Sequence, residues 1–197
     1  MALKAKEVEI IPTRDVFVGD IKAPVTLTEY GDYESEACAK ANEVVDKLLT
    51  AYAGKMRFNF RHFPLTKIHQ HAMKAAEASL GAAQEGKFWE MHNTLFAHRR
   101  RLGAISLREY AKDVGVINKK FLENLVNCTY GWSVKSDLLE GLDKGVRDVP
   151  AFFINGELFT GKPTYDNLSK GIEAALSQGK KKKPANGRTQ KAAATKV

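Results

Sequence analysis

The sequence predicts an α/β fold in which a mixed β-sheet carries helices on both of its faces. Near the start of the chain a strand, a helix and a second strand follow one another, which is typical of a parallel pair joined by a crossover helix. Near the end a hairpin is followed by a last helix. Between these units lies a block of about 80 residues with helical periodicity. A parallel pair combined with an antiparallel hairpin gives a mixed sheet.

The first unit begins with Val25–Tyr30, whose β-branched and aromatic residues favour a strand. A short turn follows, and Ser35 then opens a helical pattern that runs to about Ala53. Gly54 is a typical stop for this helix. Met56–Phe63 alternates apolar and polar residues, as a strand with one buried face does. This order predicts two adjacent parallel strands.

The helical block extends from about Ile68 to Val146, and glycines divide it into separate predicted helices. These helices cover residues 69–85, 87–99, 106–114, 118–127 and 132–145. Strand character returns at Pro150–Asn155, and the pair Asn155-Gly156 strongly favours a hairpin turn. Residues 157–160 are predicted to pair back, and a last helix is predicted over 165–176.

The length allows one good core or at most two small domains, and the composition is ordinary for a soluble globular protein. The chain has 197 residues, of which 44% are hydrophobic and 27% are charged. No stretch approaches the ~18 apolar residues that cross a bilayer. The first residues hold no apolar run typical of a secretory signal, so we expect a cytoplasmic location. We divide the chain into a lead-in over 1–22, a domain over 23–177 with a helical insertion at about 66–146, and a tail over 178–197.

The two ends of the chain differ from the domain in character. The lead-in is predicted to be irregular, apart from a short strand near Val8–Ile11. The formal net charge is +8, and residues 180–197 contain seven lysines and arginines without an acidic residue, so the remainder is nearly neutral. The tail lacks apolar residues to bury and is predicted to be disordered. Any binding of anionic partners by the tail, such as nucleic acid or acidic lipid, is predicted to be weak and salt-sensitive.

Several segments of the chain resemble one known family. They are Gly31-Asp32-Tyr33 followed by Ser35-Glu36-Ala37-Cys38, then Arg61–Leu65, Gly86–His92 and Val149–Gly156. In this order they resemble the DsbA-like thiol–disulfide oxidoreductases, and most closely the soluble bacterial branch that includes thioredoxin-like domains appended to some sodium/proton antiporters. The resemblance spans about residues 14–176. It implies a thioredoxin-like fold with a helical insertion, a cis peptide bond before Pro150 and a substrate groove beside the helix start.

The motif Ser35-x-x-Cys38 stands where the family has Cys-x-x-Cys. The first cysteine of the family's motif lies at a helix N-terminus, attacks a substrate disulfide as the thiolate, and is resolved by the second cysteine. Ser35 cannot form a disulfide, and Glu36 adds negative charge that disfavours a thiolate nearby. We therefore expect two-cysteine disulfide exchange to be lost, with binding of a peptide or partner protein retained. Whether the chain is an enzyme stays open.

Ser35 and Cys38 each have two interpretations. Ser35 is a favourable helix N-cap. Alternatively, Ser35 binds a glutathione thiolate, as the serine at this position does in kappa-class glutathione transferases, and the chain is a glutathione-dependent transferase or isomerase. Cys38 is either a small buried hydrophobe or a monothiol that can be glutathionylated. Cys128 reads as a free thiol, and we predict no disulfide between the two cysteines. No cofactor besides glutathione is expected.

Val149 and Pro150 are the remaining candidate site residues. In the family, the backbone beside this cis-proline pairs with an extended peptide or with glutathione, so a peptide or protein thiol substrate is a possible partner. The alternative is that Pro150 only shapes a turn. Arg147-Asp148 replaces small residues that often precede this proline, so the groove is expected to differ. The histidines have no partners at ligand spacing, and we expect no metal site.

Overall fold

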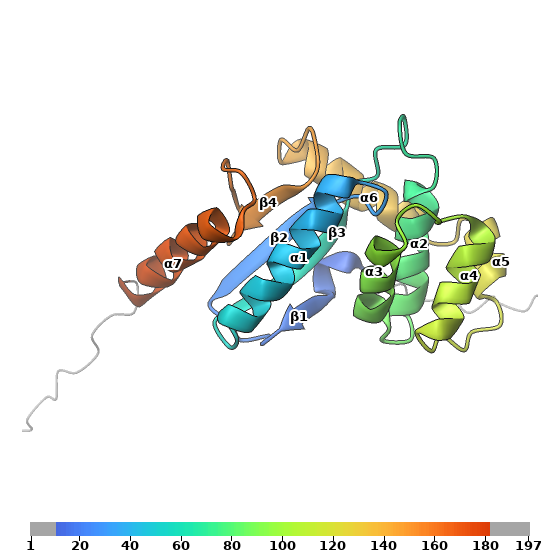
Figure 1. Ribbon diagram of the computed structural model, residues 1–197, viewed down its shortest axis with the longest axis horizontal. Helices are drawn as coiled ribbons and strands as arrows, with labels where there is room; N and C mark the ends of the chain where they lie inside the picture. The colour runs from blue at the N-terminus through green and yellow to red at the C-terminus, as the bar shows by residue number, and fades with distance from the viewer. Residues whose placement is uncertain (1–10, 182–197) are drawn as a thin grey trace, which may run out of the picture.

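The computed structural model describes residues 11–181 and has the predicted order of elements (Figure 1). The strands are β1 (Phe17–Gly19), β2 (Val25–Gly31), β3 (Met56–His62), β4 (Ala151–Ile154) and β5 (Glu157–Leu158). The helices are the 3-10 turn η1 (Thr13–Asp15), α1 (Glu36–Ala51), α2 (Ala72–Ala83), α3 (Phe88–Ala97), α4 (Ala104–Asp113), α5 (Phe121–Val126), α6 (Gly131–Asp143) and α7 (Tyr165–Lys181).

The five strands form one mixed sheet in the order β1-β3-β2-β4-β5. β2 and β3 are parallel, with Val25 opposite Met56, whereas the other three pairs are antiparallel. The parallel pair is joined by α1, and the antiparallel pair β4–β5 is the predicted hairpin. The predicted fold class is therefore confirmed.

Helices cover both faces of this sheet because side chains along a strand alternate between the faces. On β2, Glu29 faces Cys38 of α1, and the next residue, Tyr30, faces Gly141 of α6. A Cβ at Gly141 would lie 2.9 Å from Tyr30 and 2.8 Å from a carbon of Phe63, so only glycine lets α6 approach the sheet this closely. α1 and α6 thus lie on opposite faces, and α7 contacts α1 (Figure 1).

The helical insertion is built around α2, which contacts α3, α4, α5 and α6. Its sequence is rich in alanine, and nearly every residue is buried because small side chains let several helices approach one central helix. At Gly81 an added Cβ would lie 2.9 Å from the Phe121 ring of α5. The insertion is a packed helical layer beside the sheet, at the right of Figure 1.

The structure differs from the sequence-based boundaries at both ends. The lead-in contributes β1, which pairs with β3 at the edge of the sheet, whereas most of the predicted strand Val8–Ile11 lies outside the described residues. The guanidinium of Arg57 lies 4.3 Å from the Phe17 ring and helps to hold this edge strand. α7 continues to Lys181, beyond the expected domain end at residue 177. The rest of the tail lies outside the described residues, so its disorder and anion binding stay predictions.

Candidate functional site

Ser35 caps the first long helix. Its backbone is extended (φ −69°, ψ 125°), and its Oγ accepts a hydrogen bond from the Cys38 backbone N–H at 3.3 Å. Serine is favoured at this position because its oxygen satisfies an N–H that has no partner within the helix. The side chain is nearly buried, with 7% of the residue exposed. Ser35 is therefore the N-cap of α1, and its binding of a glutathione thiolate stays a prediction.

The turn between β2 and α1 is organised by Asp32, which is almost wholly buried. Its Oδ1 accepts from the Glu34 N–H at 2.8 Å, and its Oδ2 accepts from the Leu65 N–H at 2.8 Å and lies 2.9 Å from His69 Nδ1. Its backbone carbonyl accepts from the Ser35 N–H at 3.1 Å. Asp32 thus fixes the position of Ser35 relative to the segment that follows β3.

Cys38 is fully buried on the inner face of α1. Burial raises the pKa of the Cys38 thiol well above its usual range, and the nearby Glu29 carboxyl raises this pKa further. A hydrogen bond involving Ser35 acts in the opposite direction but is the smaller effect. Cys38 is therefore a protonated, shielded thiol, as the buried-hydrophobe interpretation expects, and it forms no disulfide with Cys128.

Glu29 is a site residue that the sequence reasoning missed. It is buried in the middle of β2, and burial raises the pKa of its carboxyl well above the ordinary value, partly offset by Cys38. Its Oε1 has no hydrogen-bond partner among the described residues. The strand alternation could have revealed it, since Val25, Leu27 and Glu29 share one face and the first two are core residues.

Val149 and Pro150 lie at the same end of the sheet as Ser35. The peptide bond between them is cis, and β4 begins at the next residue, Ala151. Ala151 pairs with Tyr30, near the end of β2 from which the chain turns into α1. The Val149 N–H donates to Asp148 Oδ1 at 2.8 Å. The four candidate residues from the sequence therefore lie together at one end of the sheet: Ser35, Cys38, Val149 and Pro150. The backbone N–H of Val149 is already bonded to the Asp148 carboxylate.

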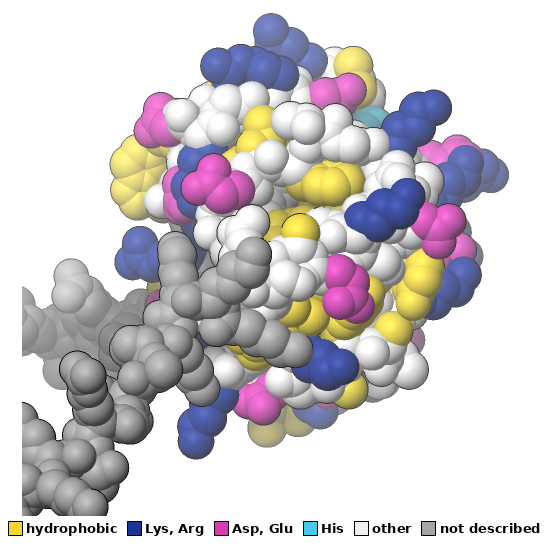
Figure 2. Space-filling model, turned by 90° about the vertical axis from the view of Figure 1, so that its left-hand side faces the viewer, with side chains coloured by type: hydrophobic (Ala, Val, Ile, Leu, Met, Phe, Trp, Pro, Cys, Tyr) yellow, Lys and Arg dark blue, Asp and Glu magenta, His cyan; other side chains and the backbone are white. Residues whose placement is uncertain are grey.

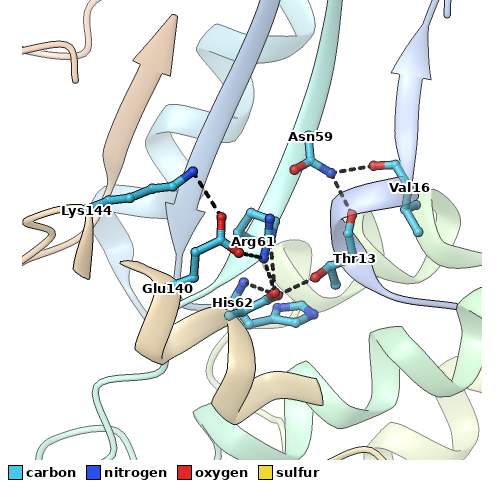
Figure 3. A network of polar contacts seen from close by, with 8 residues as sticks. Thr13, Val16, Asn59, Arg61, His62, Glu140 and Lys144 are labelled. Atoms are coloured by element: carbon cyan, nitrogen blue, oxygen red, sulfur yellow. Dashed lines mark hydrogen bonds and ion pairs between the residues drawn. The ribbon is translucent and has the colours of Figure 1, made fainter. Parts of the chain in front are cut away.

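A buried ionic network joins α6 to this end of the sheet (Figure 3). Asp137 of α6 accepts from Arg61 Nε at 2.8 Å, from the His62 N–H at 3.0 Å, and from the Thr13 hydroxyl. The Arg61 guanidinium also pairs with Glu140. Since Arg61 and His62 end β3, the network fixes the segment leading to Leu65, which in turn holds Asp32.

The two core histidines make their hydrogen bonds with residues other than Ser35. Burial lowers the pKa of His62 to about 4 and that of His92 to about 3, so both imidazoles are weak bases. The His92 ring nitrogens are taken by the Tyr33 hydroxyl at 3.1 Å and by Asn42 Oδ1 at 3.0 Å. Without a base, a serine hydroxyl is a weak nucleophile near neutral pH.

Two of the hollows on the described surface bear on the site. One, of about 490 Å³, is lined by the β4–β5 hairpin with its turn residue Asn155, by α7, and by Pro24 just before β2. It is therefore at the opposite end of the sheet from Ser35; Figure 2 views the molecule from the α7 side and shows apolar side chains exposed across this face. The other, of about 230 Å³, is lined by Phe96–Arg101 beside the start of α1.

The site has the arrangement of a thioredoxin, with a helix start and a cis-proline at the same end of the sheet. The model of a family described as Thioredoxin matches residues 12–174. The chain belongs to the thioredoxin family. Within it the chain is DsbA-like, as the sequence resemblance predicted: BdbD from Bacillus subtilis is 25% identical, with a TM-score of 0.75 over 82% of this chain and 92% of that one. A thioredoxin-like oxidoreductase from Silicibacter pomeroyi is 21% identical, with a TM-score of 0.73 over 82% and 92% of the two chains.

Curated relatives fit the predicted link to antiporters. The protein named Na(+)/H(+) antiporter NhaA 3 of Salinispora tropica is 35% identical over 92% of this chain and 28% of its own length. NhaA 1 of Mycobacterium sp. strain KMS is 34% identical over 83% of this chain and 27% of its own length. The chain thus spans little more than a quarter of these relatives. None of the relatives and structures named here is a glutathione transferase.

Residues 11–181 include no helix that is both long and apolar enough to cross a membrane. The same residues hold no cluster of three or more histidine, cysteine or acidic side chains arranged for a metal ion. The cytoplasmic location and the use of glutathione stay predictions.

Proposed function

We propose that this chain is a DsbA-like domain that binds extended peptides at the Ser35–Pro150 end of its sheet and has lost two-cysteine disulfide exchange. The observation that carries the proposal is that neither Ser35 nor Cys38 offers an exposed thiolate. Ser35 places an oxygen where exchange needs an exposed thiolate, and Cys38, the remaining sulfur, is buried and protonated.

Peptide binding rests on the backbone at Pro150. An extended peptide can add to a sheet through main-chain hydrogen bonds, and the residue before a cis-proline in this family supplies such groups. In the free protein the Val149 N–H is held by the carboxylate of the exposed residue Asp148. An incoming peptide carbonyl would take the place of that carboxylate, so the donor is occupied by a group that can swing away.

The loss of exchange is tested by insulin reduction and by oxidation of a dithiol peptide. We expect no activity from the full chain above the uncatalysed rate, and measurable exchange from Ser35→Cys, because residue 35 lies at the N-terminus of α1, where helix N–H groups stabilise a thiolate. Ser35→Ala is the matched control and should stay inactive. Exchange by the unaltered chain at rates typical of a two-cysteine enzyme would overturn the proposal.

Peptide binding is tested by fluorescence anisotropy with a labelled extended peptide. We expect saturable binding that is tightened roughly 5-fold by Asp148→Ala, since one hydrogen bond no longer has to be displaced. Asp143→Ala, which removes an exposed carboxylate at the end of α6, is the control and should leave binding unchanged. Absence of binding, or saturable binding of glutathione that Ser35→Ala abolishes, would overturn the proposal, the latter in favour of the glutathione-dependent alternative.

A further inference from the structure

Cations surround the first residue of α1. Glu36, which follows Ser35, pairs with Lys40 at 2.9 Å and with Arg99 at 3.1 Å. The positive charges of Lys40, Arg99 and Arg100 lower the pKa of this carboxyl, with Lys40 as the main cause. Arg101 follows directly, and both Arg100 and Arg101 are exposed. Glu36 is thus already paired with two cations, and the positive charges of Arg100 and Arg101 are left to attract a further anion.

The segment that carries these arginines, His98–Leu102, is held rigidly. The His98 ring stacks on the Tyr110 ring with centroids 4.8 Å apart and an angle of 15° between the planes. The Tyr110 hydroxyl donates to the Arg101 carbonyl at 3.1 Å, and Leu102 is buried in the core. A fixed backbone lowers the entropy cost of presenting the arginine side chains to a ligand.

The arginine segment is also adjacent to the proposed peptide site. The hollow of about 230 Å³ that it lines includes Phe96, whose ring lies 4.9 Å from that of Tyr33 in the turn before Ser35. Arg99 reaches the helix start itself through Glu36. A peptide that lies on the Pro150 end and passes Ser35 would therefore bring its side chains next to Arg100 and Arg101.

We propose that Arg99–Arg101 selects acidic peptides by binding a carboxylate of the peptide docked at the Ser35–Pro150 end. The inference rests on the proposed function and names its substrate class. Arg99 is anchored on Glu36, so Arg100 and Arg101 make the contact. The guanidinium group suits this role because its planar donors match a carboxylate in two parallel hydrogen bonds.

The contact is at the rim of the site, so its effect is moderate and sensitive to salt. Exposed charge pairs of this kind change affinity by a few-fold each. We expect a peptide with two adjacent aspartates to bind roughly 3–10-fold more tightly than the same peptide with asparagines at low ionic strength. The difference should shrink on going to about 0.3 M salt, where screening acts within a few ångströms.

The experiment compares these two peptides by anisotropy on the unaltered full chain and on three variants of it. The double variant Arg100→Gln with Arg101→Gln should remove the preference for the aspartate peptide and leave asparagine-peptide binding unchanged. The matched control, Lys119→Gln with Lys120→Gln, removes the same charge from exposed positions before α5 and should keep the preference. Glu36→Gln should strengthen aspartate-peptide binding, because it releases Arg99 and Lys40.

The outcomes separate the two proposals. Equal binding of both peptides by the unaltered chain overturns the acidic selectivity and leaves peptide binding standing. An equal loss of preference in the arginine and lysine double variants also overturns it, since net charge alone would then explain the effect. Failure of both peptides to bind overturns the proposed function itself.

Discussion

The two cysteines of this chain carry the same thiol in opposite surroundings. Cys38 lies in the first turn of α1 on its buried face, without exposed surface, beside the buried carboxyl of Glu29. Cys128 lies on the surface between α5 and α6, with its Sγ 3.1 Å from the ammonium of Lys74. The motif therefore keeps a shielded sulfur, that of Cys38, whereas the exposed sulfur of Cys128 lies 90 positions further along the chain. Here the surroundings of a thiol, more than its place in a motif, decide what it can react with.

The largest expected effect is a difference in alkylation rate. In the native chain, iodoacetamide should alkylate Cys128 at least ~100-fold faster than Cys38, since a buried thiol reacts only when the structure opens. Mass spectrometry of the digested protein measures both sites, and labelling in urea should modify both equally. Modification of Cys38 at the rate of Cys128 would show that α1 does not shield it.

A second experiment asks whether the buried ionic network maintains that protection. Asp137→Asn removes the charge that pairs with Arg61, which we expect to cost about 3–5 kcal/mol of unfolding free energy. Urea denaturation measures this cost, and Cys38 labelling should accelerate while that of Cys128 stays unchanged. Glu140→Gln is the matched control, because Glu140 is 34% exposed in its pair with Arg61 and should cost about 1 kcal/mol or less. Equal costs for the two variants would contradict a special role of Asp137.

The smallest effect at neutral pH concerns Glu29. Its pKa in the folded chain is raised above the unfolded value, so its contribution to stability is fully present below about pH 4 and is lost as the pH rises through the folded pKa. Glu29→Gln cannot ionise, so its stability relative to the unaltered chain should increase with pH. Urea denaturation at three pH values between 5 and 9 checks this, with the exposed Glu43→Gln as control. Parallel pH profiles for the unaltered chain and Glu29→Gln would contradict the prediction.

Local patterns predicted the elements that position the site. The alternation of Met56–Phe63, the helical spacing after Ser35 and the turn at Asn155-Gly156 are properties of neighbouring residues, and the structure has each element near its predicted bounds. The edge strand β1 was missed because three residues paired with a distant strand carry almost no periodic signal of their own.

Contacts across the fold were not predictable in this way. Arg99 meets Glu36 only because α3 packs beside α1, and Asp137 meets Arg61 only because the insertion returns over the sheet. The identity of Glu29 on a buried strand face was visible in the sequence, but its pairing with Cys38 required the packing of α1. Sequence patterns therefore located the helix start, and the family resemblance implied the cis-proline, whereas the charges around them emerged from the tertiary structure.

The carboxylate of Asp137 joins segments that are distant along the chain. It receives hydrogen bonds from Thr13 near the beginning, and from Arg61 and His62 at the end of β3, while it belongs to α6 itself. A shortened chain that begins after η1 would leave one of these bonds unmade in the interior, next to the loop that holds Asp32. The smallest fragment worth expressing therefore begins before Thr13 and keeps α6, even when only the surface around Ser35 is of interest.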